Sequence, residues 1–218
     1  MDIAEKEGRL MEDIPIEPGV PVDTWWDLGV SDSSSIIFTQ TCGAEFHVVD
    51  YLEDQGKGLA SYIERVRAKG YPAGSFNAPH DIKVREFALG KSRLEHARSL
   101  GVHFRIVPKL LHQDDVDCVR RLLPKCWFAR KKCERLIECL RQYHREYDEK
   151  SQEYSERPVH DWSSHGSSAM RYFAVGVRDS VPKSRLQLTA NENWGIFDDD
   201  NANVLGSEVA IENDPAGW

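Results

Sequence analysis

The sequence of 218 residues contains no apolar run of the roughly 18 residues that a membrane-spanning helix requires. Its N-terminus also lacks the basic region followed by an apolar one that marks a secretory signal peptide. Hydrophobic residues make up 40% of the chain and charged residues 29%, as in soluble globular proteins. These features predict a protein without membrane contact, folded as one domain with appendages or at most two small domains.

The five cysteines form no pattern that holds a metal ion or builds a disulfide framework. Their number is odd and no CxxC pair occurs among them, so we expect neither a zinc site nor structural disulfides. A chain of this kind fits a reducing cytoplasm. Cys133 and Cys139 lie on the apolar stripe of a helical segment, where we expect small buried residues rather than redox groups.

Negative charge is concentrated at one end of the chain. The net charge is −8, and residues 179–218 hold eight acidic and two basic residues, so this segment carries −6 and the rest only −2. We expect a nearly neutral folded domain over residues 23–178 and an acidic, poorly ordered tail over residues 179–218. Residues 1–22 contain three prolines and no hydrophobic period, and are interpreted as a linker or arm without a core element.

The remaining segments alternate between strand and helix patterns. The expected strands begin with one that opens at residue 24 and contains Asp27, followed by strands over residues 35–41, 45–52, 71–79, 102–107 and 125–129. The expected helices cover residues 57–68, 92–100, 114–123, 130–147 and 164–177, with a charged loop over 148–157. This order predicts an α/β fold whose mixed sheet has three antiparallel strands first and parallel strands after them, flanked by helices.

An aspartate interrupts the first, otherwise apolar strand. Side chains alternate between the two faces of a strand, so Asp27 points away from Trp26 and Leu28. A carboxylate near the middle of a sheet costs free energy unless it is paired or bound to a metal ion. Asp27 is therefore a candidate ligand, with Asp32 close by in the following turn, although a solvated strand residue and a turn aspartate would give the same pattern.

Two further aspartates stand at the ends of expected elements. Asp81 ends the fourth strand and Asp161 opens the last helix, and such ends can meet in a crevice at one edge of the sheet. Neighbouring carboxylates repel one another unless a cation neutralises them, and oxygen ligands suit Mg²⁺ or Mn²⁺. Two such ions roughly 4 Å apart can stabilise the attacking and leaving oxygens of a phosphodiester. Asp27, Asp81 and Asp161 are thus the expected catalytic and metal-binding residues, although each alone would also fit a turn or a helix cap.

The motifs around these aspartates resemble the C-terminal nuclease domain of the large terminase subunits of tailed bacteriophages. They are Trp26-Asp27-Leu28-Gly29-Val30-Ser31-Asp32, Pro79-His80-Asp81 and the segment from His160 to Tyr172, which follow in the family's order. The resemblance covers roughly residues 22–178 and implies a ribonuclease H-like fold. It implies an endonuclease that cuts concatemeric viral double-stranded DNA with two divalent ions, held by Asp27, Asp81 and an acid of the last motif, with Asp32 as a helper.

The resemblance also implies partners and a location. In this family the large subunit carries an ATPase motor domain and works with a portal and a small terminase subunit in the host cytoplasm. The GxxxxGK[ST] loop of such a motor is absent from this sequence, and Lys57 in Gln55-Gly56-Lys57-Gly58 does not complete it. We therefore expect either an excised nuclease domain or a motor on another chain, with residues 1–22 as the remainder of an interdomain linker.

One position departs from the family's pattern. Members usually read Ala-Asp-Ala before an Arg-Tyr pair, whereas here Ser168 replaces the aspartate ahead of Arg171-Tyr172. Asp161 or His165, one helical turn apart on the same face, could supply the missing ligand, although His165 would equally fit a backbone contact. The alternatives are a docking module with a weakened site that contacts the portal or procapsid, and another ribonuclease H-like nuclease such as a resolvase.

DNA contact in a nearly neutral domain must come from local basic groups. Lys83, Arg85, Lys91 and Arg93 follow Asp81 closely, and we expect them to hold backbone phosphates near the ions. Such contacts fix the position of the DNA and carry little sequence information. The alternative is an ordinary solvated face.

Overall fold

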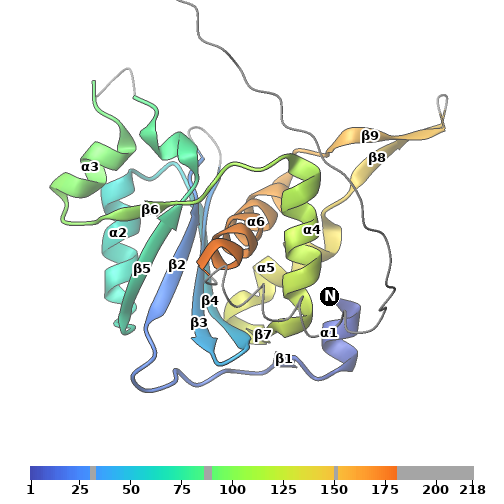
Figure 1. Cartoon of the computed structure of the whole chain (residues 1–218), viewed down its shortest axis with the longest axis horizontal. Helices are drawn as coiled ribbons and strands as arrows, with labels where there is room; N and C mark the ends of the chain where they lie inside the picture. Colours follow the sequence, from blue (N-terminus) through green and yellow to red (C-terminus); the bar gives the residue numbers. More distant parts are fainter. Residues whose placement is uncertain (30–32, 86–89, 150–151, 181–218) are drawn as a thin grey trace, which may run out of the picture. The chain divides into compact units, whose positions relative to one another are not determined.

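The computed structural model describes residues 1–29, 33–85, 90–149 and 152–180, and a seven-stranded sheet runs through this part of the chain (Figure 1). The strands are β1 (Leu10–Met11), β2 (Val22–Asp27), β3 (Ser33–Cys42), β4 (Glu45–Gln55), β5 (Ala73–Ala78), β6 (Phe104–Ile106) and β7 (Cys126–Ala129). Their order across the sheet is β1-β7-β4-β3-β2-β5-β6. From residue 181 onward, the expected acidic tail lies outside the described residues.

The pairing of these strands confirms the predicted mixed sheet. Strands β2, β3 and β4 pair antiparallel, and the short Cys42–Glu45 connection makes β3 and β4 a hairpin. Strand β5 pairs in parallel with β2, β6 with β5, β7 with β4 and β1 with β7. An antiparallel meander extended by parallel strands is the arrangement of a ribonuclease H-like sheet.

Helices cover both faces of the sheet. They are α1 (Asp2–Lys6), α2 (Leu59–Ala68), α3 (Arg93–Ser99), α4 (His112–Leu122), α5 (Arg130–Gln142) and α6 (Trp162–Ser180), with short 3-10 turns η1 (His80–Lys83) and η2 (Leu123–Lys125). Helices α2 and α3 lie on one side of the sheet, and α4, α5 and α6 lie on the other (Figure 1). None of the helices in the described ranges has both the length and the apolar character needed to cross a bilayer.

The consecutive tryptophans of β2 lie on opposite faces of the sheet, and both are buried. Trp25 packs against Phe173 of α6, with ring centroids 5.1 Å apart, and Trp26 packs against Phe104 of β6 at 5.2 Å. Helix α6 carries a glycine, Gly176, where a β-carbon would collide with the Trp25 ring. The absence of a side chain at this position therefore lets α6 approach β2 closely.

The segment after α5 differs from the prediction. The helix expected to reach residue 147 ends at Gln142, and the expected charged loop forms a hairpin of β8 (Arg145–Asp148) and β9 (Glu153–Pro158) that projects from the sheet (Figure 1). Tyr147 and Tyr154 face each other across the two strands, with ring centroids 5.0 Å apart. Cross-strand aromatic pairs stabilise hairpins, and this pairing overrides the helical spacing of Tyr143 and Tyr147.

The interpretation of residues 1–22 as lacking a core element was wrong. Leu10–Met11 forms β1 beside β7, and Ala4, Leu10 and Ile14 are buried in the hydrophobic core. The Arg9 side chain donates hydrogen bonds to the carbonyls of Leu123 and Cys126. A two-residue strand is too short to give a periodic signal, so only the tertiary pairing reveals it.

Candidate active site

Asp27 is the last residue of β2 and is half-buried. It lies opposite Ser35 of β3, which in turn lies opposite Glu53 of β4, so these three side chains share one face of the sheet. Trp25, two residues earlier on the same face, packs against α6. Asp27 therefore points to the side of the sheet that α6 covers.

Arg93 holds the chain directly after Asp27. Its guanidinium donates to the carbonyl of Leu28 at 2.8 Å and to that of Gly29 at 3.3 Å. Arg93 begins helix α3, whose N-terminus is fixed by a capping box between Ser92 and Glu95. This contact anchors the end of β2 to α3, a positioning role that differs from the predicted phosphate contact. Of the other predicted DNA-binding residues, Lys83, Arg85 and Lys91 are exposed.

Asp81 lies in η1, just after β5, and is exposed. Strand β5 runs parallel to β2 with Asn77 opposite Trp25, so Asp27 and Asp81 lie at neighbouring strand ends on the same edge of the sheet. Burial raises the pKa of the Tyr172 hydroxyl in α6, and the negative charges of Asp27 and Asp81 raise it further. Both carboxylates thus influence the same hydroxyl from the ends of neighbouring strands.

Asp161 directly precedes α6 and has a local structural contact. Its Oδ1 accepts hydrogen bonds from the backbone N–H of Ser163 at 2.8 Å and from the Ser163 hydroxyl at 2.6 Å. These bonds hold the pKa of Asp161 below its ordinary value. A carboxylate in this position caps the helix, and it lies about 10 Å along the helix axis from Ser168.

His165 is half-buried in the first turns of α6. Its ring meets the ring of His160 edge to face, with centroids 5.6 Å apart, and His160 Nδ1 lies 3.1 Å from the Ser164 hydroxyl. The two imidazoles thus lie together at the start of the helix. Asp32, the proposed helper, lies outside the described residues.

Ser168, at the position where the terminase family usually has an aspartate, is held by an arginine. Arg171 Nη2 donates to the Ser168 hydroxyl at 2.9 Å, and Arg171 Nη1 lies 3.0 Å from Asp115 Oδ2 in α4. Burial raises the pKa of Asp115, and the neighbouring Arg171 offsets part of this shift. Sequence reasoning missed this pair because its members lie 56 positions apart on two helices, with no local pattern linking them.

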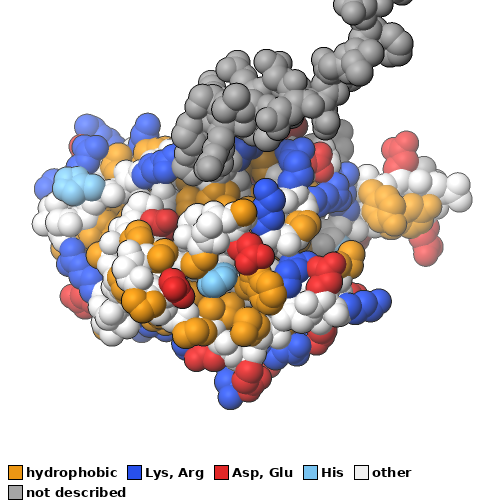
Figure 2. Space-filling view, turned by 60° about the horizontal axis from the view of Figure 1, so that its bottom comes forward, with side chains coloured by type: hydrophobic (Ala, Val, Ile, Leu, Met, Phe, Trp, Pro, Cys, Tyr) orange, Lys and Arg blue, Asp and Glu red, His pale blue; other side chains and the backbone are white. Residues whose placement is uncertain are grey.

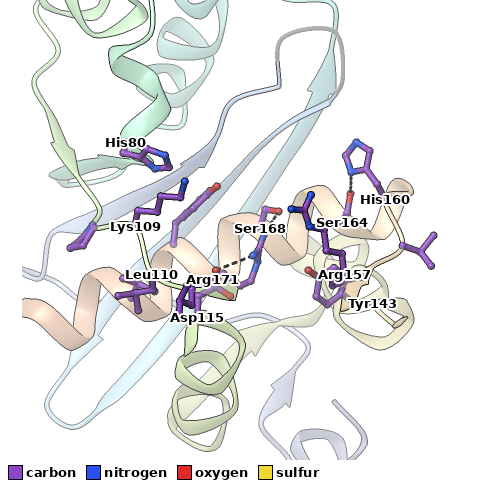
Figure 3. A pocket seen from close by; sticks show the side chains of 16 residues that line it. His80, Lys109, Leu110, Asp115, Tyr143, Arg157, His160, Ser164, Ser168 and Arg171 are labelled. Atoms are coloured by element: carbon purple, nitrogen blue, oxygen red, sulfur yellow. Dashed lines mark hydrogen bonds and ion pairs between the residues drawn. The ribbon is translucent and has the colours of Figure 1, made fainter. Parts of the chain in front are cut away.

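A pocket of about 470 Å³ opens beside these residues. Figure 3 shows His80 and Lys109 on one side of it and Arg157 and His160 on the other, with Arg171 of α6 between them. Tyr172 also lines the pocket, which therefore borders the hydroxyl that Asp27 and Asp81 influence. Neither Lys109 nor Arg157 was predicted as a site residue, since each stands outside the motifs and apart from other basic residues.

Whether these residues fit a metal ion depends on their donor chemistry. Over residues 1–29, 33–85, 90–149 and 152–180, no group of three or more His, Cys, Asp or Glu side chains is arranged to hold a metal. Asp27 and Asp81 do supply two hard carboxylates at neighbouring strand ends. Mg²⁺ is commonly bound by one or two carboxylates together with waters and substrate phosphates. The pair therefore fits an ion shared with a substrate, and does not form a closed protein cage.

Fold and site together define a ribonuclease H-like α/β domain with carboxylates at the ends of its central strands. The solved structures that it matches include large terminases of bacteriophages, which confirms at the level of fold the resemblance seen in the motifs. The likeness is at low sequence identity, and it shows the fold. No protein-family model matches the sequence, and no curated protein matches it.

Three of these structures illustrate the match. The large terminase of a thermophilic bacteriophage, in complex with ATP-gamma-S, has a TM-score of 0.61 and 17% identity, covering 79% of this chain and 44% of that one. The P22 large terminase nuclease domain has a TM-score of 0.57 and 14% identity, with coverages of 79% and 89%. The g2p (large terminase) nuclease domain of bacteriophage SPP1 with bound Mn has a TM-score of 0.52 and 17% identity, with coverages of 78% and 97%. The chain thus spans less than half of the thermophilic phage's terminase and most of the two nuclease domains.

Proposed function

We propose that this chain is a divalent-metal-dependent endonuclease domain that cuts concatemeric viral double-stranded DNA during packaging. The observation that carries the proposal is the placement of Asp27 and Asp81 at the neighbouring ends of β2 and β5, with Tyr172 influenced by both charges. The shared fold with a terminase nuclease domain solved with bound Mn supports the same chemistry. The cofactor is Mg²⁺ or Mn²⁺.

When bound, such an ion lowers the pKa of a coordinated water and offsets charge on the phosphodiester oxygens. The protein's own residues position this chemistry. Arg93 fixes the chain at Leu28 and Gly29, which limits the movement of the Asp27 carboxylate. The Tyr172 hydroxyl, like any tyrosine at neutral pH, is protonated, and it can donate a hydrogen bond to a carboxylate or phosphate oxygen.

A second ion requires a further donor, which the proposal draws from the start of α6. Asp161 is the assigned third ligand and His165 the alternative, since Ser168 is a weak neutral ligand held by Arg171. Asp161 combines this role with its hydrogen bonds to Ser163. Binding of two ions would therefore require one of two side chains to turn toward the strand ends. These are Asp161, through the oxygen that does not accept from Ser163, and the His165 ring.

The proposed partners extend beyond this chain. The chain spans less than half of the thermophilic phage's large terminase, so an ATPase motor domain, the portal and the small terminase subunit are proposed partners, and the host cytoplasm is the proposed location. Residues 1–22 would connect to the motor, either within a longer protein or through contact with another chain. The proposed nuclease domain includes residues 1–22, since β1 belongs to its sheet and Leu10 and Ile14 to its core.

A plasmid-nicking assay with Mg²⁺ or Mn²⁺ tests the activity. We expect Asp27→Ala and Asp81→Ala each to lower the cleavage rate by about 100-fold or more, because a lost ligand removes several kcal/mol of transition-state stabilisation. Glu64→Ala, which removes an exposed carboxylate of α2 on the other side of the sheet, serves as the control and should cut like the wild type. Equal cleavage by wild type and Asp27→Ala would contradict the proposal.

A second candidate function is a docking module without cleavage, which contacts the portal or procapsid. The observation that favours it is the Arg171–Ser168 hydrogen bond at the position where the family usually has an acid, since it leaves two convergent carboxylates instead of three. The same assay separates the two functions. A docking module would show no cleavage above background at any Mg²⁺ or Mn²⁺ concentration.

A further inference from the structure

A second pocket, of about 350 Å³, adjoins the one beside Tyr172. The two share Tyr143 and Pro158 in their walls, and the second reaches Tyr154 of the β8–β9 hairpin. We treat the two adjoining pockets as one groove, which extends from His80 and Tyr172 to the hairpin. Five basic side chains line it, from the β6–α4 connection, α4, the hairpin and α6, and we call it the cationic groove: Lys109, Arg120, Arg145, Arg157 and Arg171.

The charges along the cationic groove are not balanced by acids. Asp115 pairs with Arg171 and Asp117 pairs with Arg120, each at 3.0 Å, so these two carboxylates already neutralise two of the five cations. Within the described ranges, no ion pair joins Lys109 or Arg157 to a carboxylate. On the face shown in Figure 2, by contrast, basic and acidic side chains are interspersed. The groove is thus a local excess of positive charge on a nearly neutral domain.

This excess lies next to the carboxylates that would hold an ion. Tyr172 lines the groove, and the charges of Asp27 and Asp81 raise the pKa of its hydroxyl. A nucleic-acid strand carries phosphates at regular spacing, so one phosphate at the carboxylates would bring its neighbours into the groove. A single small anion would fill only one of the two adjoining pockets, whereas a strand with several phosphates would fill both.

We propose that the cationic groove binds the backbone phosphates of the DNA strand that leads from Asp27 and Asp81 toward the β8–β9 hairpin, through Lys109 and Arg157. This inference rests on the proposed function, in that it takes DNA as the substrate. It assigns the main phosphate contacts to residues other than the predicted group after Asp81, of which Arg93 is bound to the carbonyls of Leu28 and Gly29.

Binding of a short fluorescent DNA duplex without divalent ions, measured over a series of salt concentrations, tests the groove separately from cleavage. We expect Lys109→Ala combined with Arg157→Ala to weaken binding at least about tenfold and to reduce the slope of log K against log salt by about 2, since each phosphate contact contributes about 0.9. Both side chains are exposed, so the fold should be retained, which a melting curve checks. Lys109→Arg combined with Arg157→Lys should keep the wild-type slope, because the charge remains.

The control removes the same charge elsewhere. Lys6→Ala combined with Lys125→Ala changes two exposed lysines that do not line the groove, and should leave the salt slope unchanged. Equal losses in the groove variant and the control variant would overturn the inference, as would a wild type that does not bind the duplex. A groove variant that binds poorly while wild type binds well but never cuts would support the groove and contradict the nuclease. A groove variant that binds and cuts like wild type would contradict the groove alone.

Discussion

At the scale of single residues, the site depends on side chains whose neighbours are distant in sequence. Arg93 anchors Leu28 and Gly29 across 65 and 64 positions, and Arg171 joins Asp115 to Ser168. Asp161 differs from these residues, because its hydrogen bonds come from Ser163, two positions further along the chain. A residue with two local hydrogen bonds has a structural role that is independent of any metal ion.

Substitution of Asp161 separates its capping role from its proposed ligand role. Asp161→Ala should lower the free energy of unfolding by about 1 kcal/mol, whereas Asp161→Asn should preserve it because asparagine caps helices equally well. Asp161→Asn should nevertheless weaken Mn²⁺ binding, because the neutral amide is a poorer ligand than a carboxylate. Urea unfolding and Mn²⁺ titration measure the two effects. Unchanged Mn²⁺ affinity in Asp161→Asn would leave Asp161 as a cap alone.

The same residue makes the stability of the cap depend on pH. Hydrogen bonds from Ser163 lower the pKa of Asp161 in the folded state below its ordinary value of 3.8. A lowered folded pKa stabilises the protein above the unfolded pKa, and this contribution is lost as the pH falls through the folded value. The difference in stability between wild type and Asp161→Asn should therefore change only at acidic pH.

At the scale of elements, helix α6 organises the site side of the sheet. It carries Ser168, Arg171 and Tyr172 toward the pocket and packs on β2 through Phe173. Its fit depends on Gly176, where a side chain would meet the Trp25 ring. The position of the pocket-lining residues of α6 therefore depends on a glycine that is not itself part of the pocket.

Gly176→Ala should lower the free energy of unfolding by about 1–3 kcal/mol, because overpacking forces a rigid indole or the whole helix to shift. This loss should exceed the gain of up to about 1 kcal/mol that alanine offers over glycine within a helix. Gly58→Ala is the matched control, since nothing lies within 4 Å of a β-carbon there, and its cost at the helix cap should stay within about 1 kcal/mol. A Gly176→Ala protein more stable than wild type would contradict the close packing of α6 on β2.

At the scale of the whole described domain, the N-terminal segment closes one edge of the sheet. Strand β1 covers β7, and Leu10 and Ile14 enter the core. Glu5 of α1 also pairs with Arg130 and Arg141 of α5. Exposed ion pairs contribute little, so burial of the apolar side chains is the main contribution of this segment to stability.

Deletion of residues 1–14 should therefore lower the free energy of unfolding by about 3 kcal/mol or more, since Leu10 and Ile14 each contribute about 1.5–3 kcal/mol by burial. Urea unfolding at neutral pH measures the change. Glu5→Gln, which removes only the exposed ion pairs, should leave the unfolding midpoint nearly unchanged. A deletion variant as stable as the full chain would mean that the segment is a linker after all.

Most of the framework can be predicted from the amino-acid sequence. Alternation and helical spacing predicted β3, β4, β5 and the helices α2, α3 and α4, and the aspartates at element ends pointed to one edge of the sheet, where β2 and β5 end as neighbouring strands. These signals are local, or follow from how sheet strands end at a common edge, and so they can be seen without coordinates.

The remaining features depend on how the elements pack against one another. The β8–β9 hairpin and β1 form by strand pairing, and no local periodicity in the sequence predicts them. The cationic groove brings together Lys109, Arg157 and Arg171 from three separate elements. Such features depend on which faces meet when the chain packs. The sequence around an isolated basic residue does not show which residues it will face in the folded protein. Sequence patterns therefore cannot predict such a groove.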